Sequence, residues 1–398
     1  MALFFALLIA GAGEPIRHVS PTTALWTTPC ILVSALLITW AAESAQFFIA
    51  QGFALAILAW LQTLPEFAVE AVLAWHRQVP YLLANLTGAL RLLTGLGWPA
   101  IYFAAAFVHR KNTKQPLLRI QLHTQHSVQV VGLIIPLAYM TFVWWKGTLH
   151  LYDAIFLIAI YAAYLTLLHR MPPQDQEGID DLERIPRAIV LSPRPRRIAL
   201  IALFFLAGGA LIYFTAEPFL GSLMALAALA HIPNFVFIQW VAPFVSEFPE
   251  MASTFYWART VVHAPMALMN MVSSNINQWT LLVAMLPIVY SLSLGAPAGI
   301  PLDPQQELEL LMTIGQALLG LLFLINMELA WWEASVLFAL WVIQFVFSAI
   351  APEGGIHWDI TITYYAWAIL ELFRLLIGKR DAAAFREFAH VWRTYVMR

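Results

Sequence analysis

Long stretches of hydrophobic residues, separated by short polar segments, run through this chain of 398 residues. Several of the stretches reach the ~20 residues that an α-helix needs to cross a bilayer. We therefore expect an all-α polytopic membrane protein. The expected spans are 24–50, 53–76, 79–107, 127–145 and 149–169, followed by 198–230, 233–258, 262–293, 307–326, 331–350 and 357–378.

Polar segments divide these spans into groups. A linker at 170–197, rich in proline, arginine and acidic residues, separates five spans within 24–169 from five within 198–350. Segment 351–398 adds an extra C-terminal helix and a basic tail. Segment 1–23 holds an apolar run that is too short to span, so we expect a half-inserted helix there. A cleaved signal peptide is the alternative, although no lysine or arginine precedes the run.

The positions of lysine and arginine predict the orientation. If the first span runs from outside to inside, sixteen basic residues fall on the cytoplasmic side and only three outside. The linker and the C-terminus are then cytoplasmic, and the N-terminus lies outside. Because an odd number of spans precedes the linker, the second group of five enters from the opposite side. We therefore expect ten core helices arranged as two inverted five-helix repeats, a common transporter architecture.

The composition supports a membrane protein and excludes other classes. Hydrophobic residues make up 61% of the chain and charged residues only 11%, about half of what a soluble protein carries. The single Cys30 excludes an intramolecular disulfide framework. The basic residues are scattered over loops, so we expect no nucleic-acid partner. No enzyme-like constellation or cofactor motif appears, and we expect the bilayer and transported cations as partners, in a plasma or bacterial inner membrane.

Two glutamates lie in the middle of apolar runs, each directly after a proline: Glu66 and Glu250. A proline interrupts the hydrogen-bond ladder of a helix. A carboxylate in hydrocarbon is costly and usually marks an ion pathway. In each half, the following span carries an asparagine, Asn85 or Asn270. Discontinuous helices at corresponding positions of two halves predict a transport site at the breaks.

These segments resemble the paired alpha repeats of the cation/calcium exchanger superfamily, which read roughly G-T-S-L-P-E and then G-N-x-x-G-S-N. The Pro-Glu position matches in both halves. The second motif is matched at Asn85 and Gly88, and again at Asn270, Ser274 and Asn275. The resemblance implies an antiporter of the sodium/calcium or calcium/proton type, with Glu66 and Glu250 at its ion site.

The chain also departs from the family pattern. The Thr-Ser pair before Leu-Pro-Glu has become Gln62-Thr63 in the first repeat, and the second repeat has Ser246-Glu247. The Ser-Asn of the first repeat has become Ala89-Leu90, and the next family position for Asn or Asp is Leu93. The first repeat has thus lost oxygen ligands, so the multiple sodium sites of the family do not carry over whole.

The chemistry of these residues suits a hard cation. Calcium takes about six to eight oxygen ligands. Glu66 and Glu250 supply carboxylates, and Glu70 and Glu247 either enlarge the set to four or point into an aqueous vestibule. Further side-chain oxygens come from Thr63, Ser246, Asn270, Ser274 and Asn275, and from Asn85. For Asn85 and Asn270, hydrogen bonding between helices is the alternative.

Alternating access needs a counter-ion that discharges the site, and clustered carboxylates make the proton a natural one. Sodium is the alternative. Arg91 is either a fixed cation opposite the carboxylates or a structural partner of Glu70 or Glu43. The expected function is exchange of calcium or another divalent cation. Two alternatives keep the same fold: a monovalent cation/proton antiporter, and a degenerate membrane protein that does not transport.

Overall fold

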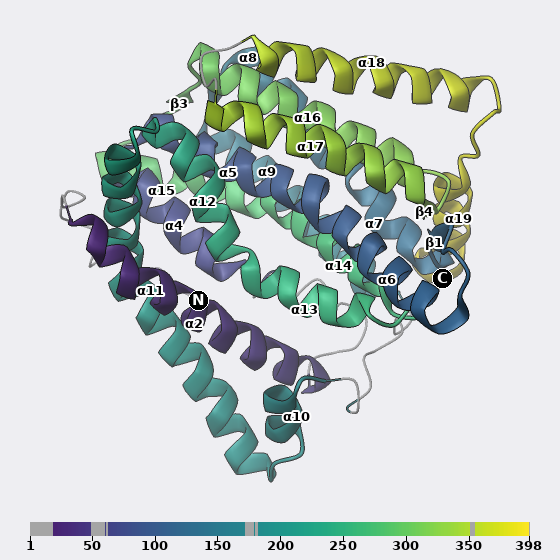
Figure 1. The fold of residues 1–398 in the computed structure, drawn as a ribbon, viewed down its shortest axis with the longest axis horizontal. Helices are drawn as coiled ribbons and strands as arrows, with labels where there is room; N and C mark the ends of the chain where they lie inside the picture. The colour runs from purple at the N-terminus through teal and green to yellow at the C-terminus, as the bar shows by residue number, and fades with distance from the viewer. Residues whose placement is uncertain are drawn as a thin grey trace.

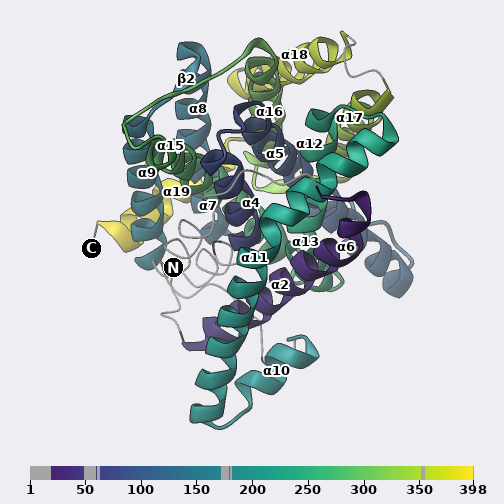
Figure 2. The ribbon, with the colours of Figure 1, turned by 90° about the vertical axis from the view of Figure 1, so that its left-hand side faces the viewer.

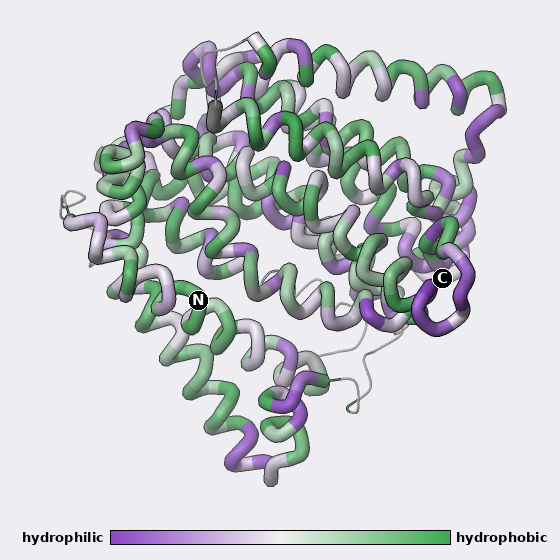
Figure 3. The backbone as a smooth tube through the Cα atoms, in the orientation of Figure 1, coloured by the Kyte–Doolittle hydropathy of each residue, from purple (hydrophilic) through white to green (hydrophobic). Residues whose placement is uncertain are grey.

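The computed structural model describes residues 19–48, 60, 63–171, 179, 182–350 and 355–397. These residues are mostly helical (Figure 1). Eight helical segments are long and apolar enough to cross a membrane: Pro21–Ala45, Val79–Thr113, Thr124–Lys146, Leu151–His169, Arg194–Ala230, Ala264–Leu294, Pro304–Leu324 and Trp331–Ser348. Figure 3 shows hydrophobic residues over most helices, with hydrophilic residues gathered near α10 and around the C-terminus. The expected class of helical membrane protein is confirmed.

The first half of the chain carries one long helix followed by shorter ones. Its helices are α2 (Ala24–Ala45), α4 (Leu64–Trp75), α5 (Val79–Leu92), α6 (Trp98–Thr113), α7 (Ser127–Gly132), α8 (Ile134–Lys146) and α9 (Leu151–His169). A π-helical turn, η4 (Leu93–Gly97), joins α5 to α6 without a break. The short helix α10 (Arg184–Val190) lies in the linker.

The second half repeats this order. Its helices are α11 (Arg194–Ala230), α12 (Asn234–Ser246), α13 (Phe248–Ala258), α14 (Ala264–Asn277), α15 (Val283–Leu294), α16 (Pro304–Leu324) and α17 (Trp331–Ile350). A second π-helical turn, η7 (Gln278–Leu282), joins α14 to α15 as η4 joins α5 to α6. The chain ends with α18 (Ile356–Leu376), α19 (Ala383–Val391) and the turn η8 (Trp392–Val396).

Four short strands pair across the two halves. Strand β1 (Arg119–Gln121) is antiparallel to β4 (Glu328–Ala330), and β2 (Thr148–Leu149) is antiparallel to β3 (Ile300–Pro301). Each sheet therefore takes one strand from each half of the chain. The pairing satisfies backbone groups where helices end, and those groups are costly to leave unpaired. The all-α expectation did not include these four strands, each of which has two or three residues.

The centre of the molecule is formed by α4, α5 and α14. Every residue of α14 is buried, as are all residues of α4 except Trp75. The long helices α2 and α11 pack side by side along one flank (Figures 1 and 2). Helices α16, α17 and α18 cover another, with α18 packed on α16. The polar residues of the sequence motifs thus lie in the interior.

The described helices differ in part from the expected spans. The span expected at 233–258 is two helices, α12 and α13, which meet at Glu247. The span expected at 53–76 is described only at Trp60 and over 63–76, where α4 lies, since 53–59 and 61–62 lie outside the described residues. The expected half-inserted N-terminal helix and residues 172–178 of the linker also lie outside them. The extra C-terminal helix expected at 357–378 corresponds to α18, which is not among the eight candidate spans.

Candidate ion-binding site

The two Pro-Glu motifs each begin a helix. Pro65 lies in the first turn of α4 and Pro249 in the first turn of α13. Proline is tolerated there because the first backbone N–H groups of a helix have no partner within it. Glu66 and Glu250 therefore also lie in first turns, where the helix dipole favours a negative charge. The sequence places both carboxylates at helix N-termini inside the protein.

In the second half, the carboxylate of Glu250 is held by the following helix. Its Oε1 accepts hydrogen bonds from the Ser274 hydroxyl and, at 3.5 Å, from Asn270 Nδ2. Both donors lie on α14, one turn apart. The motif residues Asn270 and Ser274 are thus brought onto the glutamate that the resemblance pointed to.

The first half has a related contact, but on a different glutamate. Asn85 Nδ2 of α5 donates to Glu70 Oε1 at 2.9 Å. In the first half, Glu70 is therefore the glutamate that accepts from the motif asparagine, as Glu250 is in the second half. Both Glu70 and Asn85 are fully buried. The expectation that Glu70 belongs to the buried carboxylate set, and not to a wet vestibule, fits this burial.

A single amide links the two halves. Gln278 Nε2, in the turn η7, donates to Glu66 Oε2 and to Glu247 Oε1, each at 2.8 Å. The carboxyl group of Glu247 also lies within interaction distance of those of Glu66 and Glu250. Three carboxyl groups from both halves of the chain therefore meet around Gln278.

The hydroxyl groups of Thr63 and Ser246 form hydrogen bonds with groups other than the carboxylates. Thr63 Oγ1 accepts a hydrogen bond from Asn277 Nδ2 at 2.6 Å and donates to the carbonyl oxygen of Trp60. Ser246 Oγ donates to the Ala242 carbonyl at 3.1 Å, within its own helix. Both hydroxyl oxygens keep lone pairs, so each retains acceptor capacity.

The ten residues expected at the site share one property, which is near-complete burial. None exposes more than 5% of its surface: Glu66, Glu70, Glu247, Glu250, Thr63, Ser246, Asn85, Asn270, Ser274 and Asn275. Ionisable groups at this depth are costly without a counter-charge.

Among the described residues, several buried oxygen atoms at the site have no hydrogen-bond donor. They are Glu66 Oε1, Glu70 Oε2, Glu250 Oε2, Asn85 Oδ1, Asn275 Oδ1, Asn277 Oδ1 and Gln278 Oε1. Unpaired buried acceptors are rare in native proteins. Carboxylate and amide oxygens are the ligands of hard cations. Within the part of the chain that the structure describes, no group of three or more His, Cys, Asp or Glu side chains is placed to hold a metal ion.

Comparison with known protein families identifies the family of the chain. The sequence matches the family model described as sodium/calcium exchanger protein over residues 19–169 and 200–350. The chain belongs to this exchanger family. No curated protein sequence matches it significantly.

Several solved structures share the fold of this family member. A crystal structure of the H+/Ca2+ exchanger CAX has 30% sequence identity and a TM-score of 0.83, over 95% of this chain and 92% of that one. The structure of native YfkE has 14% identity and a TM-score of 0.59, over 87% and 99% of the two chains. A structure of the sodium–calcium exchanger NCX_Mj has 16% identity and a TM-score of 0.53, over 81% and 96%. The last two support the fold alone.

The structure gives Arg91 of this exchanger a partner that the sequence did not suggest. Its guanidinium forms a buried ion pair with Glu309 of α16, not with Glu70 or Glu43. It also lies 5.3 Å from the centre of the Trp240 ring. The expected pairing of Arg91 with Glu70 or Glu43 was wrong, because a helix distant in sequence supplies the counter-charge. The other expectation, a fixed cation opposite the carboxylates, stays a prediction.

Sequence reasoning missed two groups of functional interest. Glu309 lies near the start of a predicted span and has no motif around it. Asn277 and Gln278 directly follow the matched motif, and two adjacent amides within an apolar helix were the available signal. The role of Gln278 as a bridge depends on contacts between the two halves of the chain.

Proposed function

We propose that this protein is a secondary active antiporter, which exchanges calcium or another divalent cation for protons by alternating access. The meeting of Glu66, Glu247 and Glu250 around Gln278 carries the proposal. Carboxyl oxygens from both halves, with the amides of Asn270 and Asn275 and the hydroxyls of Thr63, Ser246 and Ser274, make an oxygen-rich site suited to a hard divalent ion.

The proton is the counter-ion that the site supports best. Carboxylates packed this closely repel one another in a medium of low dielectric constant. Either a divalent cation or protons relieve this repulsion, so the two compete for one site. The 30% identity to an H+/Ca2+ exchanger over most of both chains supports the same choice over sodium. The missing oxygens at Ala89 and Leu93 are a further reason to disfavour several sodium sites.

We also propose that the helices form two inverted five-helix repeats. The strand pairing supports this arrangement, because β1 and β3 follow equivalent helices, as do β2 and β4. Exchanging the two halves therefore converts the β1–β4 sheet into the β3–β2 sheet, as a twofold relation requires. The basic residues favour a cytoplasmic linker and C-terminus, with the N-terminus outside.

The decisive experiment is ion flux in proteoliposomes. Vesicles loaded with calcium would be given a proton gradient or a sodium gradient separately, using wild type, Glu66→Gln and Glu250→Gln. The control is Glu328→Gln, since Glu328 forms a surface ion pair with Arg119. Calcium flux driven by protons, lost in both site variants and kept in the control, is the expected result.

Other results point to the alternatives. Calcium flux driven only by a sodium gradient would mean that the counter-ion is sodium, and the proposed site would stand. Flux of sodium or potassium driven by protons, without divalent flux, would indicate a monovalent antiporter. Folded protein with no flux of any kind would indicate a membrane protein that has kept the fold and lost transport.

A further inference from the structure

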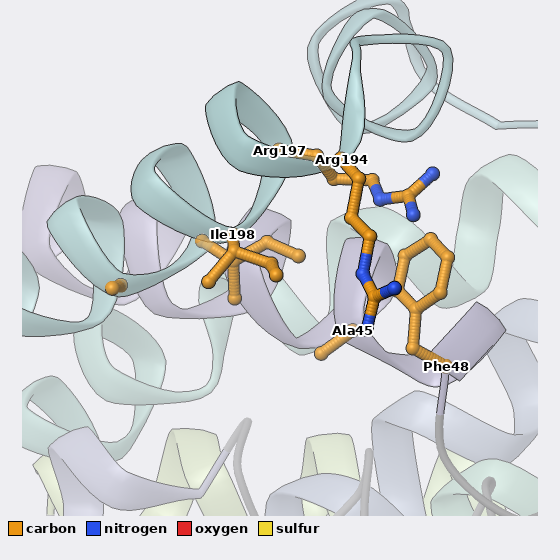
Figure 4. A pocket seen from close by; sticks show the side chains of 7 residues that line it. Ala45, Phe48, Arg194, Arg197 and Ile198 are labelled. Carbon is orange, nitrogen blue, oxygen red and sulfur yellow. The ribbon is translucent and has the colours of Figure 1, made fainter.

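A groove opens where the end of α2 meets the start of α11 (Figure 4). Its volume is about 600 Å³, within the range of ligand pockets. Apolar side chains and two arginines line it: Ala45 and Phe48 from the end of α2 and the turn η2 (Gln46–Phe48), and Arg194, Arg197, Ile198, Ile201 and Ala202 from α11. We call this the arginine groove.

The arginines at this groove are part of a basic cluster. Five arginines lie within α10 and the first turn of α11: Arg184, Arg187, Arg194, Arg196 and Arg197. Figure 4 shows Arg194 and Arg197 on the same side of the groove as Phe48. The guanidinium of Arg197 lies 3.9 Å from the centre of the Phe48 ring and donates to the Val190 carbonyl at 3.3 Å.

The positive charge of the groove is not neutralised within the part of the chain that the structure describes. No carboxylate there forms an ion pair with Arg194 or Arg197. The nearby Glu183 instead accepts a hydrogen bond from Trp40 Nε1 at 3.0 Å. A groove that is apolar along its walls and cationic at one end fits an amphipathic anion.

The position of the groove on α11 indicates where such an anion comes from. Directly after Arg197 the helix becomes apolar, and Ile198, Leu203 and Leu206 each expose more than half of their surface. The change from arginine to exposed aliphatic side chains marks the border between polar headgroups and hydrocarbon. The guanidinium groups therefore lie at the depth of lipid phosphates, and the apolar walls lie at the depth of acyl chains.

We propose that the arginine groove binds an anionic phospholipid, with its phosphate at Arg194 and Arg197 and an acyl chain along Ile198, Ile201 and Ala202. Guanidinium groups recognise phosphate through paired hydrogen bonds. Basic pockets beside membrane helices on the cytoplasmic side are typical sites for anionic headgroups. This inference does not depend on which ion the protein transports.

The bound lipid joins α2 to α11, the long helices of the two halves. These helices already approach closely, since Ser34 Oγ donates to the Gly208 carbonyl at 2.7 Å. A Cβ atom added at Gly208 would be 2.8 Å from Ile38. A lipid at the end of this pair bridges both helices and strengthens their contact.

The test measures lipid binding by native mass spectrometry of the full-length protein in detergent. Phosphatidylglycerol, phosphatidylcholine and soluble glycerophosphate would be titrated separately. We expect phosphatidylglycerol to bind best. The double variant Arg194→Gln/Arg197→Gln should weaken the binding of phosphatidylglycerol by roughly 10- to 30-fold, because each arginine supplies about one interaction with the headgroup. Ala202→Trp fills the groove from an exposed position and keeps both arginines, so it should also block binding.

The matched control is Arg110→Gln/Lys111→Gln, which removes two exposed basic residues at the end of α6. Normal binding in this control supports the arginine groove. An equal loss in the control would show unspecific charge attraction and overturn the proposal. Equal binding of phosphatidylcholine and phosphatidylglycerol would also overturn the proposal. If glycerophosphate bound as tightly as the lipid, the ligand would be a free phosphate ester and the proposal would be overturned. Unchanged binding in Ala202→Trp would show that the acyl chain does not lie in the groove, and would overturn this part of the proposal.

Discussion

Arg91 of α5 and Glu309 of α16 form an ion pair in which neither side chain exposes more than 1% of its surface. Gln239 of α12 donates to the same Glu309 oxygen at 2.9 Å. His357 Nδ1 of α18 lies 3.4 Å from the other oxygen, and its Nε2 is 2.9 Å from Ser348 Oγ. This charge-balanced cluster connects the helix that carries Asn85 to the outer helices.

Arg91→Met should destabilise the protein strongly. It leaves the Glu309 carboxylate buried without a cation, and breaking a buried pair in this way costs about 3–5 kcal/mol. The measurement is thermal unfolding of the purified protein in detergent. Arg91→Met/Glu309→Leu removes both charges and should recover most of the loss, because replacing a whole pair is often close to neutral. A single variant as stable as wild type would contradict the burial of this pair.

Gly88→Ala should force α5 and α12 apart. A Cβ atom at Gly88 would lie 1.8 Å from the backbone oxygen of Gln239, which no side-chain rotation relieves. Overpacking of this kind costs about 1–3 kcal/mol or more. Gly355→Ala is the control, since a Cβ atom there meets none of the described residues within 4 Å. Thermal unfolding of both variants distinguishes them, and equal stability would argue against this close helix contact.

Gln278→Leu should weaken cation exchange more than it weakens the fold. It removes both hydrogen bonds that join Glu66 to Glu247. Hydrogen bonds to charged groups contribute about 1.5–3 kcal/mol each, and 1.4 kcal/mol is a tenfold change in affinity. We expect the KM for calcium to rise by roughly tenfold or more, measured by flux in proteoliposomes.

Gln316→Leu is the control for Gln278→Leu. Gln316 is equally buried but donates to the backbone oxygen of Arg91 at 3.0 Å, away from the carboxylates. It should lower thermal stability and leave the KM unchanged. If both variants changed the KM alike, Gln278 would be a general packing residue and not part of the ion site.

Asn275→Leu should separate stability from ion binding. The Asn275 amide is buried, and neither of its polar atoms has a hydrogen-bond partner among the residues that the structure describes. Replacing an unpaired polar group by an apolar one of similar shape is nearly neutral or stabilising. Without calcium, thermal stability should therefore stay the same or rise. The stabilisation that added calcium gives to wild type should shrink, because an oxygen ligand has been lost. An undiminished calcium effect would exclude Asn275 from the site.

Much of the fold followed from the hydrophobic pattern alone. A helix satisfies its own backbone hydrogen bonds, so a long apolar run in a membrane protein specifies a helix without knowledge of its neighbours. The prolines before Glu66 and Glu250 marked where helices begin, since proline restricts its own backbone. The four strands escaped prediction because each has two or three residues and exists only through its partner in the other half.

Local order in the chain also determined that the motif glutamate and asparagine lie together in the second half. Glu250 and Asn270 occupy consecutive helices joined by a short turn, so their contact is close to a property of the sequence. Only the tertiary structure decided that Gln278 joins Glu66 to Glu247, and that Arg91 pairs with Glu309. Both contacts connect segments separated by more than 180 residues along the chain. Hydropathy and helical periodicity describe one helix at a time, whereas the partner of a buried charge is chosen by how the helices pack.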